Sequence, residues 1–444
     1  MFFVYSILTA IGMLVTSPYF LLKGLRRGKY LANLGARFGT VPPEVKRKCG
    51  GCIWIHSVSV GEVLAALPLA RDLKKEFPDK PLVISTTTET GQKLARERME
   101  FADGVIYFPF DWAWAARRVM RALRPACVVI LETEIWPNFL RVAHREGVPV
   151  IFANGRISDR SMRRYSRLLS LFGFVLRPFL RKTLSYPALF LAQTDKDAAR
   201  VEELGMPPDR VRVTGNLKYD SPEPPESEFG RWLARAVEKY GRRPLIVAGS
   251  VTAGEEPLVL IAFGVLQGEM RNAFLVLAPR KPDRFDAAAK HIEESQRGYI
   301  RRSAISPASN DGLALSSGTS VLLLDSIGEL AGIYRCADAV YVGGSMVPAG
   351  GHNVLEPAGF GKPPLFGTSM ENFSGIADLL LARHAARRVE NPEDLGVAWI
   401  ELIGAPEKNR AMGEAARAIV EENRGATRRT VDQIAGVLRG RSRA

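Results

Sequence analysis

From residue 53 onward, short apolar runs alternate with stretches in which apolar residues recur at helical spacing. The run at 53–55 precedes such a stretch at 63–77, and "PLVIST" (81–86) precedes "TGQKLARERM" (90–99). In the same way, "ACVVILETEIW" (126–136) precedes "NFLRVAHREG" (138–147). An alternation of strand-like and helix-like patterns is typical of parallel α/β units. We therefore predict an α/β protein.

The alternating pattern stops once and then restarts. The composition turns to Pro and Glu at "DSPEPPESE" (220–228), as in interdomain connectors. A strand-like run follows, and "SVTAGE" (250–255) echoes "SVSVGE" (57–62) near the start of each half, so that Thr252-x-x-Glu255 repeats the cap arrangement of Ser59-x-x-Glu62. We predict two Rossmann-like domains that face each other across a cleft. The predicted boundaries are an N-terminal membrane anchor at 1–30, domains at 31–221 and 222–425, and a C-terminal helix and tail at 426–444.

The N-terminus carries an uncharged apolar run over residues 1–22, followed by Lys23, Arg26, Arg27 and Lys29. A run of this length can span a bilayer or lie in one face of it. The bases that follow predict that the rest of the chain lies in the cytoplasm. The stretch "RRYSRLLSLFGFVLRPFLRK" (163–182) mixes bases with Leu and Phe at helical spacing, which fits either membrane-surface contact or an ordinary packed helix.

Composition and charge restrict the classes of partner and compartment that the protein can have. The chain has 444 residues, of which 46% are hydrophobic and 24% charged, as in ordered proteins of two or three domains. Its formal charge of +14 calls for an anionic partner, namely a membrane surface, a nucleic acid or a phosphorylated substrate. A nucleic acid is disfavoured because no RRM, HTH or KH signature is present. The four cysteines indicate a reducing compartment.

The sequence lacks the motifs that several kinds of binding site and reaction require. Cys49-Gly-Gly-Cys52 has no second Cys pair to complete a zinc site, and the five histidines show no ligand spacing. Neither G-x-G-x-x-G in strand-to-helix context nor a P-loop occurs, which argues against hydride transfer and ATP hydrolysis. Asp195-x-Asp197 resembles a metal-diphosphate motif, but Thr194 with Asp197 favours a helix start.

The first half offers carboxylates. Ser59-x-x-Glu62 fits a capping box, so Glu62 either caps a helix or carries chemistry. Glu132 and Glu134 lie two apart at a predicted strand end, hence on one face of that strand, where they form either an acid–base pair or ion pairs with arginines. Lys218 precedes the connector and either reaches across the cleft or is simply solvated.

The second half places unusual residues at consecutive predicted strand ends. Arg280 follows one strand, Asp325 ends another and opens a helix, and glycines follow a third. A further helix begins at about Asn353, with Glu356 one turn in. Helix N-termini suit phosphate, Arg binds it through a planar fork, and Glu356 suits ribose hydroxyls. Together these features predict a nucleotide site, although Asp325 and Asn353 also fit ordinary N-caps.

The chain closely resembles the 3-deoxy-D-manno-octulosonic acid (Kdo) transferase family from about residue 19 to 425. The resemblance is carried, in order, by "HSVSVGE", "LETEIWPN", "NGRISDRS", "VTGNLKYD", "LAPRKPDRF", "SIGELAGIY" and "VGGSMVPAGGHNVLEPAGFGKP". It implies a GT-B fold and inverting transfer of Kdo from CMP-Kdo to a lipid A precursor, lipid IVA, in lipopolysaccharide core biosynthesis. It further implies no metal or other cofactor, and a location on the cytoplasmic face of the inner membrane.

The resemblance also implies roles for individual residues. Glu62 would be the general base, while Glu132 and Lys218 would stabilise the transition state. One departure is Ala36, where many relatives have Glu. Two alternatives are a GT-B enzyme that uses another nucleotide sugar, such as a UDP-sugar, and a membrane-tethered nucleic-acid binder. The residues implied to hold CMP are Pro279, Arg280, Ile327, Gly328, Glu329, Asn353, Val354, Leu355 and Glu356.

Overall fold

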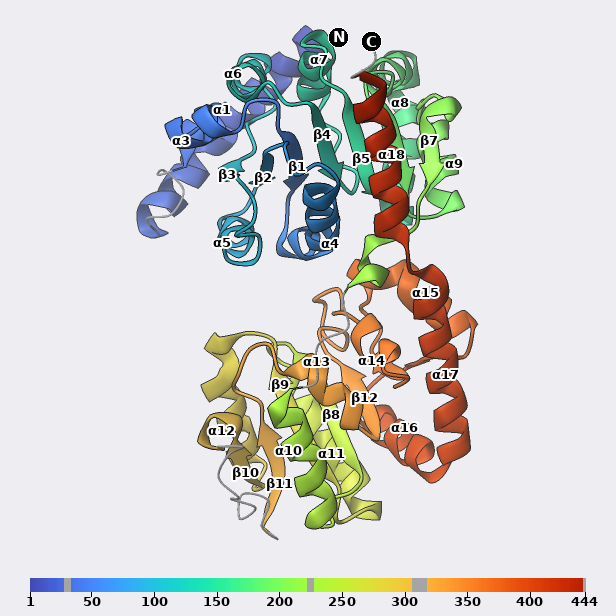
Figure 1. Cartoon of the computed structure of the whole chain (residues 1–444). Helices are drawn as coiled ribbons and strands as arrows, with labels where there is room; N and C mark the ends of the chain where they lie inside the picture. The colour runs from blue at the N-terminus through green and yellow to red at the C-terminus, as the bar shows by residue number, and fades with distance from the viewer. Residues whose placement is uncertain (28–32, 222–226, 306–317, 442–444) are drawn as a thin grey trace. The chain divides into compact units, whose positions relative to one another are not determined.

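The computed structural model describes residues 1–27, 33–221, 227–305 and 318–441. The chain divides into two compact units (Figure 1). Unit 1 comprises Met1–Ser221 together with Asn423–Ala444, and unit 2 comprises Pro222–Glu422. Residues 222–226 of the predicted connector and Lys29 of the predicted basic cluster lie outside the described residues.

The described part of unit 1 contains a seven-stranded parallel sheet in the order β3-β2-β1-β4-β5-β6-β7. The chain proceeds from β1 outward to β3, then returns to place β4 on the other side of β1. The strand order therefore reverses between β1 and β4, which makes a topological switch point. The strands are β1 (Ile53–Ser57), β2 (Leu82–Thr86), β3 (Gly104–Tyr107), β4 (Cys127–Leu131), β5 (Val150–Gly155), β6 (Leu189–Ala192) and β7 (Val211–Val213).

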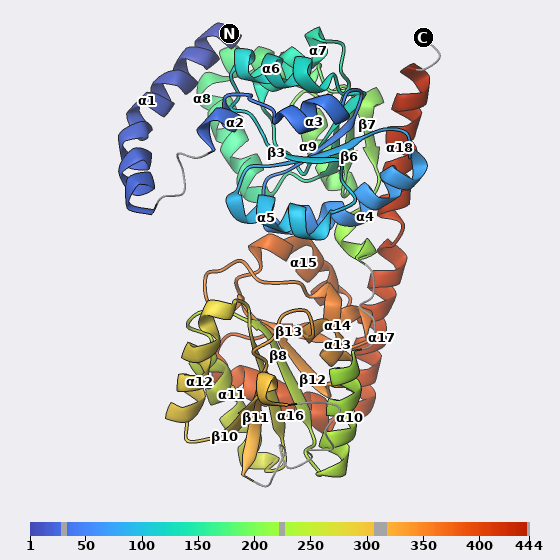
Figure 2. The same ribbon diagram turned by 60° about the vertical axis from the view of Figure 1, so that its left-hand side comes forward.

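Helices cover both faces of the unit 1 sheet, as is usual for parallel sheets. Successive residues of one strand point to opposite faces, so they join different buried clusters. Trp54 joins one buried cluster with side chains of α6, α7 and α9, while Ile55 joins another with α4, α5 and α18. The last helix, α18, thus completes unit 1 (Figures 1 and 2). The helices are α1 (Phe2–Arg27), α2 (Leu34–Arg37), α3 (Pro43–Lys48), α4 (Val60–Glu76), α5 (Glu89–Arg98), α6 (Ala113–Leu123), α7 (Pro137–Arg145), α8 (Asp159–Leu184), α9 (Asp195–Glu203), the 3₁₀ turns η1 (Pro208–Arg210) and η2 (Leu217–Asp220), and α18 (Ala426–Arg441).

Unit 2 follows a similar plan, except that β11 lies between β9 and the edge strand β10. Its described strands form a seven-stranded parallel sheet in the order β10-β11-β9-β8-β12-β13-β14, which reverses between β8 and β12. The strands are β8 (Leu245–Val251), β9 (Phe274–Pro279), β10 (Gly298–Arg301), β11 (Thr319–Leu323), β12 (Ala339–Val342), β13 (Pro364–Phe366) and β14 (Arg387–Arg388). The helices are α10 (Glu228–Lys239), α11 (Glu256–Glu269), α12 (Phe285–Glu294), α13 (Leu330–Ile333), α14 (Leu355–Gly359), α15 (Ser374–Ala382), α16 (Pro392–Gly404) and α17 (Pro406–Asn423), with short 3₁₀ turns at Pro282–Arg284, Arg302–Ala304, Tyr334–Cys336 and Glu371–Phe373.

The first turns of helix α1 pack on the rest of unit 1. The Tyr5 hydroxyl donates to Asp111 Oδ2 at 2.9 Å, and the Phe2 ring lies 5.0 Å from that of Phe179 on α8. Among the described helices, none combines the length and the apolar character needed to span a bilayer.

The structure confirms the helix start predicted at Thr194. Thr194 is the N-cap of α9 and accepts from the Asp197 amide at 3.1 Å, so "QTDKD" begins a helix. The Asp197 carboxylate is also used internally, since it accepts from the Ile157 amide at 2.9 Å. Cys49 and Cys52 are both fully buried among apolar side chains, a placement that the sequence did not predict.

Candidate active site

The candidate site in unit 1 contains Glu62, which lies in the first turn of α4, just after β1. Ser59 is the N-cap, and the predicted capping box is confirmed. The Glu62 carboxylate accepts from the Val58 amide at 2.7 Å and from the Ser59 hydroxyl at 2.8 Å. These bonds fix the carboxylate at the end of β1.

The surroundings of Glu62 suit a base. The residue is only 8% exposed, and the pKa of its carboxyl is raised to about 7. Burial is the largest cause and the charges of Glu132 and Glu134 add to it, whereas the Val58 amide and the Ser59 side chain oppose the rise. A carboxyl that ionises near neutral pH is matched to proton abstraction at physiological pH.

Glu132 follows β4, directly across the switch point from Glu62. The prediction that Glu132 and Glu134 share one face of a strand is wrong, because β4 ends at Leu131. Glu132 instead adopts φ = 57°, a left-handed conformation that costs free energy for a non-glycine residue and often occurs at functional sites. Its Oε1 lies 3.9 Å from Lys218 Nζ. Burial raises the pKa of Glu134, and the charge of Glu132 adds to this effect.

Lys218 lies in η2, and its ammonium approaches the Glu132 carboxylate. Burial lowers the pKa of its ammonium, whereas the charges of Glu132 and Glu62 oppose that shift. Unit 1 therefore gathers Glu62, Glu132 and Lys218 at the carboxyl ends of its strands, beside the β1–β4 switch point, where open α/β sheets bind ligands.

The C-terminal helix α18 anchors the turn that carries Lys218. Asp220, the last residue of that turn, accepts from the amides of Gly425 (2.7 Å) and Thr427 at the start of α18. Arg429 Nε donates to the Thr214 carbonyl at 2.9 Å on the other side of the turn. This role could not be predicted from the sequence, because a helical pattern alone does not show which domain a helix joins.

In unit 2, the predicted residues at the ends of β9 and α14 come together. Arg280 follows Pro279, and its amide donates to the Val251 carbonyl at 2.8 Å. The Asn353 side chain accepts from the Leu355 amide at 3.1 Å and donates to Glu356 Oε1 at 3.1 Å. Burial raises the pKa of Glu356, while Asn353 and the charge of Arg280 lower it.

His352 is a further residue of this site, and the sequence offers no signal for it beyond its position among histidines that lack metal-ligand spacing. Burial, with the charge of Arg280, lowers the pKa of His352 to about 4, so the ring is neutral at neutral pH. Its Nε2 lies 3.0 Å from Thr252 Oγ1. A Cβ on Gly344 would lie 2.7 Å from His352 Cδ2, so the ring requires glycine there.

The loop after β11 differs from the prediction. Asp325 neither ends the strand nor caps a helix, because β11 ends at Leu323 and α13 begins only at Leu330. Asp325 instead accepts from the Ser303 amide at 2.8 Å. Ile327 and Gly328 therefore lie in a loop, and Ile327 is 61% exposed. Glu329 is held by Arg302, whose Nη2 lies 2.8 Å from Glu329 Oε1.

The echo of the capping box at 250–255 is only partial. The prediction that Thr252-x-x-Glu255 repeats the cap is wrong, since α11 begins at Glu256 with Glu255 itself as N-cap. The fully buried Glu255 carboxylate accepts from the Thr252 amide (2.8 Å) and the Tyr341 hydroxyl (2.8 Å). It also accepts from the amides of Gly344 (2.5 Å), Ser345 (2.9 Å) and Met346 (2.9 Å), and thereby fixes the glycine turn after β12.

Replacing Glu255 tests this role. In Glu255→Gln the side-chain NH₂ faces donors, so at least one buried amide loses its acceptor. We expect the free energy of unfolding to fall by about 3 kcal/mol, because unsatisfied buried donors are costly. Chemical denaturation measures the loss, and hydrogen exchange at 343–346 should accelerate. Glu269→Gln, at the exposed end of the same helix, should leave both unchanged; equal behaviour of the two variants would contradict the assignment.

Within the described residues, no three His, Cys, Asp or Glu side chains gather as potential metal ligands. Cationic side chains do lie near both candidate sites: Lys218 with Arg156 nearby in unit 1, and Arg280 in unit 2.

Comparison with solved structures supports the same architecture. A putative UDP-N-acetylglucosamine 2-epimerase from Listeria monocytogenes aligns over 88% of this chain and 96% of its own, with a TM-score of 0.54 and 14% identity. A co-structure of S. aureus MnaA with UDP aligns over 86% and 95%, also with a TM-score of 0.54, at 16% identity. At these identities the likeness concerns the fold alone.

The two Rossmann-like units, each with a switch point, give the chain a fold of the GT-B class. A family model described as 3-deoxy-D-manno-octulosonic-acid transferase (kdotransferase) matches residues 32–221. The Kdo transferase of Haemophilus influenzae is 31% identical over 95% of this chain and 96% of its own length, and that of Bordetella pertussis is 33% identical over 90% of each. The chain therefore belongs to the Kdo transferase family, and it is a glycosyltransferase.

Proposed function

We propose that this protein transfers Kdo from CMP-Kdo to a lipid A precursor, lipid IVA, with inversion at the anomeric carbon and without a metal. The observation that carries the proposal is Glu62, a nearly buried carboxyl whose pKa of about 7 suits a base and which lies beside Glu132 and Lys218. Family membership supports the choice of sugar.

On the acceptor side, the ionised Glu62 carboxylate takes the proton from the attacking hydroxyl of the lipid. That oxygen then bonds to the anomeric carbon of Kdo from the face opposite CMP, which inverts the configuration. The bond from this carbon to the phosphate oxygen breaks, and its electron pair leaves with CMP. Lys218, held by Glu132, offsets the negative charge that accumulates on the departing groups.

On the donor side, unit 2 holds CMP at the carboxyl ends of its strands. Arg280 follows Pro279 and pairs with phosphate, and Glu356 accepts from ribose hydroxyls. Val354 and Leu355 have buried side chains, so they contribute backbone groups at the start of α14. Asn353 orients Glu356, and the loop of Ile327, Gly328 and Glu329 flanks the nucleotide.

A donor assay tests the proposed reaction. Purified protein is incubated with CMP-Kdo and a tetraacylated lipid A precursor in detergent, and released CMP is followed. We expect CMP release to depend on the lipid, and free CMP to inhibit it more strongly than UDP does. Lipid-independent release, or stronger inhibition by UDP, would contradict the assignment and favour a UDP-sugar enzyme.

We also propose that unit 1 sits on the cytoplasmic face of the inner membrane through α1 and α8. Helix α8 exposes a row of apolar side chains, of which Leu171 is 66% and Phe174 is 86% exposed. Helix α1, which packs on α8 through Phe2 and Phe179, exposes Phe3 (74%). Exposed apolar residues next to the bases of α8 favour a helix that lies in the interface.

Charged substitutions on α8 test this location. We expect Leu171→Asp with Phe174→Asp to weaken binding to phosphatidylcholine vesicles by about 10- to 100-fold, because two apolar side chains no longer insert. Flotation of vesicles with bound protein measures the change. The matched control is Ile261→Asp with Val397→Asp on unit 2, where the parent residues are 48% and 42% exposed. Equal binding by both double variants would contradict the proposed membrane face.

A further inference from the structure

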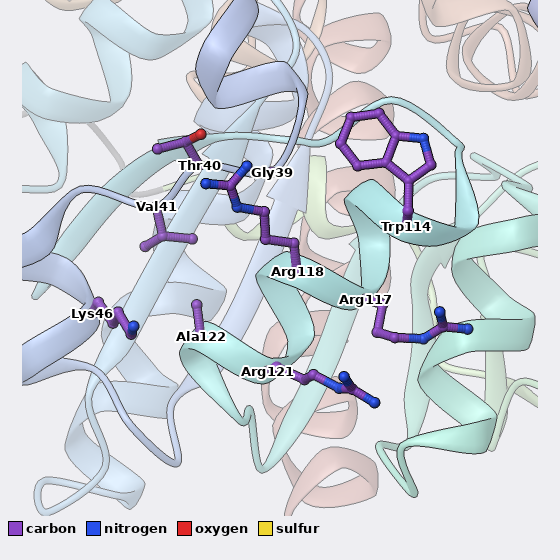
Figure 3. A pocket seen from close by; sticks show the side chains of 9 residues that line it. All are labelled: Gly39, Thr40, Val41, Lys46, Trp114, Arg117, Arg118, Arg121 and Ala122. Carbon is purple, nitrogen blue, oxygen red and sulfur yellow. The ribbon is translucent and has the colours of Figure 1, made fainter.

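Unit 1 contains a surface pocket that none of the proposed catalytic residues lines. It lies between α6 and the segment that leads into α3, and its volume is about 490 Å³, within the range of small-ligand sites. Figure 3 shows the Arg118 side chain rising between Val41 and Trp114, toward Gly39 and Thr40. The polar and aromatic residues of the lining are Thr40, Lys46, Trp114, Arg117, Arg118 and Arg121.

The charge of the pocket is entirely positive, since four cations and no carboxylate line it. Arg117 and Arg121 extend to the side of α6 away from Lys46 (Figure 3), and Glu146 lies 3.8 Å and 3.3 Å from their respective Nε atoms. In the described part of the chain, Lys46 and Arg118 have no ion-pair partner. Of the four lining cations, Lys46 and Arg118 are therefore available to an anion.

Three stacked aromatic side chains, Phe38, Trp112 and Trp114, lie on the Trp114 side of the pocket. Phe38 stacks on Trp112 and on Trp114, with ring centroids 5.7 Å and 5.6 Å apart. The Trp114 side chain is nevertheless 50% exposed, although the inner face of α6 is well buried. A rigidly held, half-exposed indole next to Lys and Arg is typical of side chains at the headgroup level of a bilayer.

We propose that this pocket binds the phosphate headgroup of an anionic membrane lipid. Arg118 and Lys46 contact the phosphate, Thr40 donates a hydrogen bond to it, and Trp114 packs against the adjoining glycerol and acyl carbons. The inference rests on the proposed membrane location. It adds a defined site for one phosphate group to the general attraction that the bases of α8 exert on anionic lipids.

Vesicle binding tests the pocket without any transfer reaction. The full chain is floated with vesicles of phosphatidylcholine alone and of equal parts phosphatidylcholine and phosphatidylglycerol. We expect the wild type to prefer the anionic vesicles, and Lys46→Ala with Arg118→Ala to lose about 10- to 30-fold in affinity for them, since each surface cation contributes about a fivefold effect. Binding to phosphatidylcholine should stay unchanged.

The matched control removes the same charge elsewhere on unit 1. Lys75→Ala with Lys93→Ala removes two exposed lysines that pair with Asp72 and Glu97, and it should keep the preference for anionic vesicles. Equal loss in both double variants would overturn the pocket and indicate nonspecific attraction. Saturable binding of glycerol phosphate at Lys46 and Arg118 without a preference for anionic vesicles would also overturn the lipid assignment. Failure to bind either vesicle would overturn the membrane location together with the pocket.

Discussion

Replacing Glu62 with Gln should lower kcat for Kdo transfer by about 10²- to 10⁴-fold, the usual contribution of a positioned general base. The amide cannot accept the proton of the attacking hydroxyl. The fold should survive, because Gln also serves at the third position of a capping box and can still accept from the Val58 amide. Steady-state transfer assays and thermal unfolding of the same preparation measure the two effects.

Two comparisons separate the base from the cap. Ser59→Ala removes the hydroxyl that bonds to Glu62 and should cost about 1 kcal/mol of stability while keeping most of the activity. The wild-type kcat/KM should rise as pH increases through about 7, because only the ionised Glu62 acts as a base. This limb should be missing in Glu62→Gln. A Gln variant with wild-type turnover and the same pH profile would remove Glu62 from the mechanism.

Replacing Lys218 with Gln should lower kcat by about 10²- to 10³-fold, as does the loss of a preorganised group that stabilises charge in the transition state. The KM for CMP-Kdo should change little, since the cation acts on charge that develops during transfer. The substitution also leaves Glu132 without the ammonium that lies 3.9 Å from its Oε1. Steady-state kinetics over a range of donor concentrations separates kcat from KM.

Lys218→Arg serves as the control for charge. It keeps a cation at the end of η2 but changes its geometry, so it should retain more activity than the Gln variant. If Lys218→Gln raised KM and left kcat unaltered, Lys218 would contribute only to donor binding. If Lys218→Arg and Lys218→Gln lost activity equally, the shape of the side chain rather than its charge would matter.

Periodicity and local motifs predicted much of the fold. The parallel strands and the helix starts at Ser59 and Thr194 follow from short-range rules, because alternation and caps depend on neighbouring residues. The partnership of α18 with unit 1 did not follow from the sequence. That helix joins unit 1 through contacts between Asp220 and residues about 200 positions later in the chain, and such contacts leave no local pattern.

The candidate site, like the fold, was predicted from the sequence only in part. The carboxylates and glycines were found because unusual residues follow predicted strands. Their exact settings were not, because strand ends are set by tertiary packing: β4 stops before Glu132, and β11 stops before Asp325. Glu255 looked like a second Glu62 in sequence, yet its carboxylate is consumed by five donors of the fold. Four of these donors belong to Tyr341 and residues 344–346, so the segment 250–255 alone does not show that Glu255 is a buried anchor.

The mass of the lipid product tests the central proposal most directly. Wild-type protein, CMP-Kdo and a tetraacylated lipid A precursor are incubated, and the extracted lipid is examined by mass spectrometry beside a Glu62→Gln reaction. We expect the wild-type lipid to gain whole Kdo residues in proportion to the CMP released, and the Gln reaction to leave the lipid unchanged. A wild-type lipid of unaltered mass, or a Gln variant that forms the product at the same rate, would contradict the proposal.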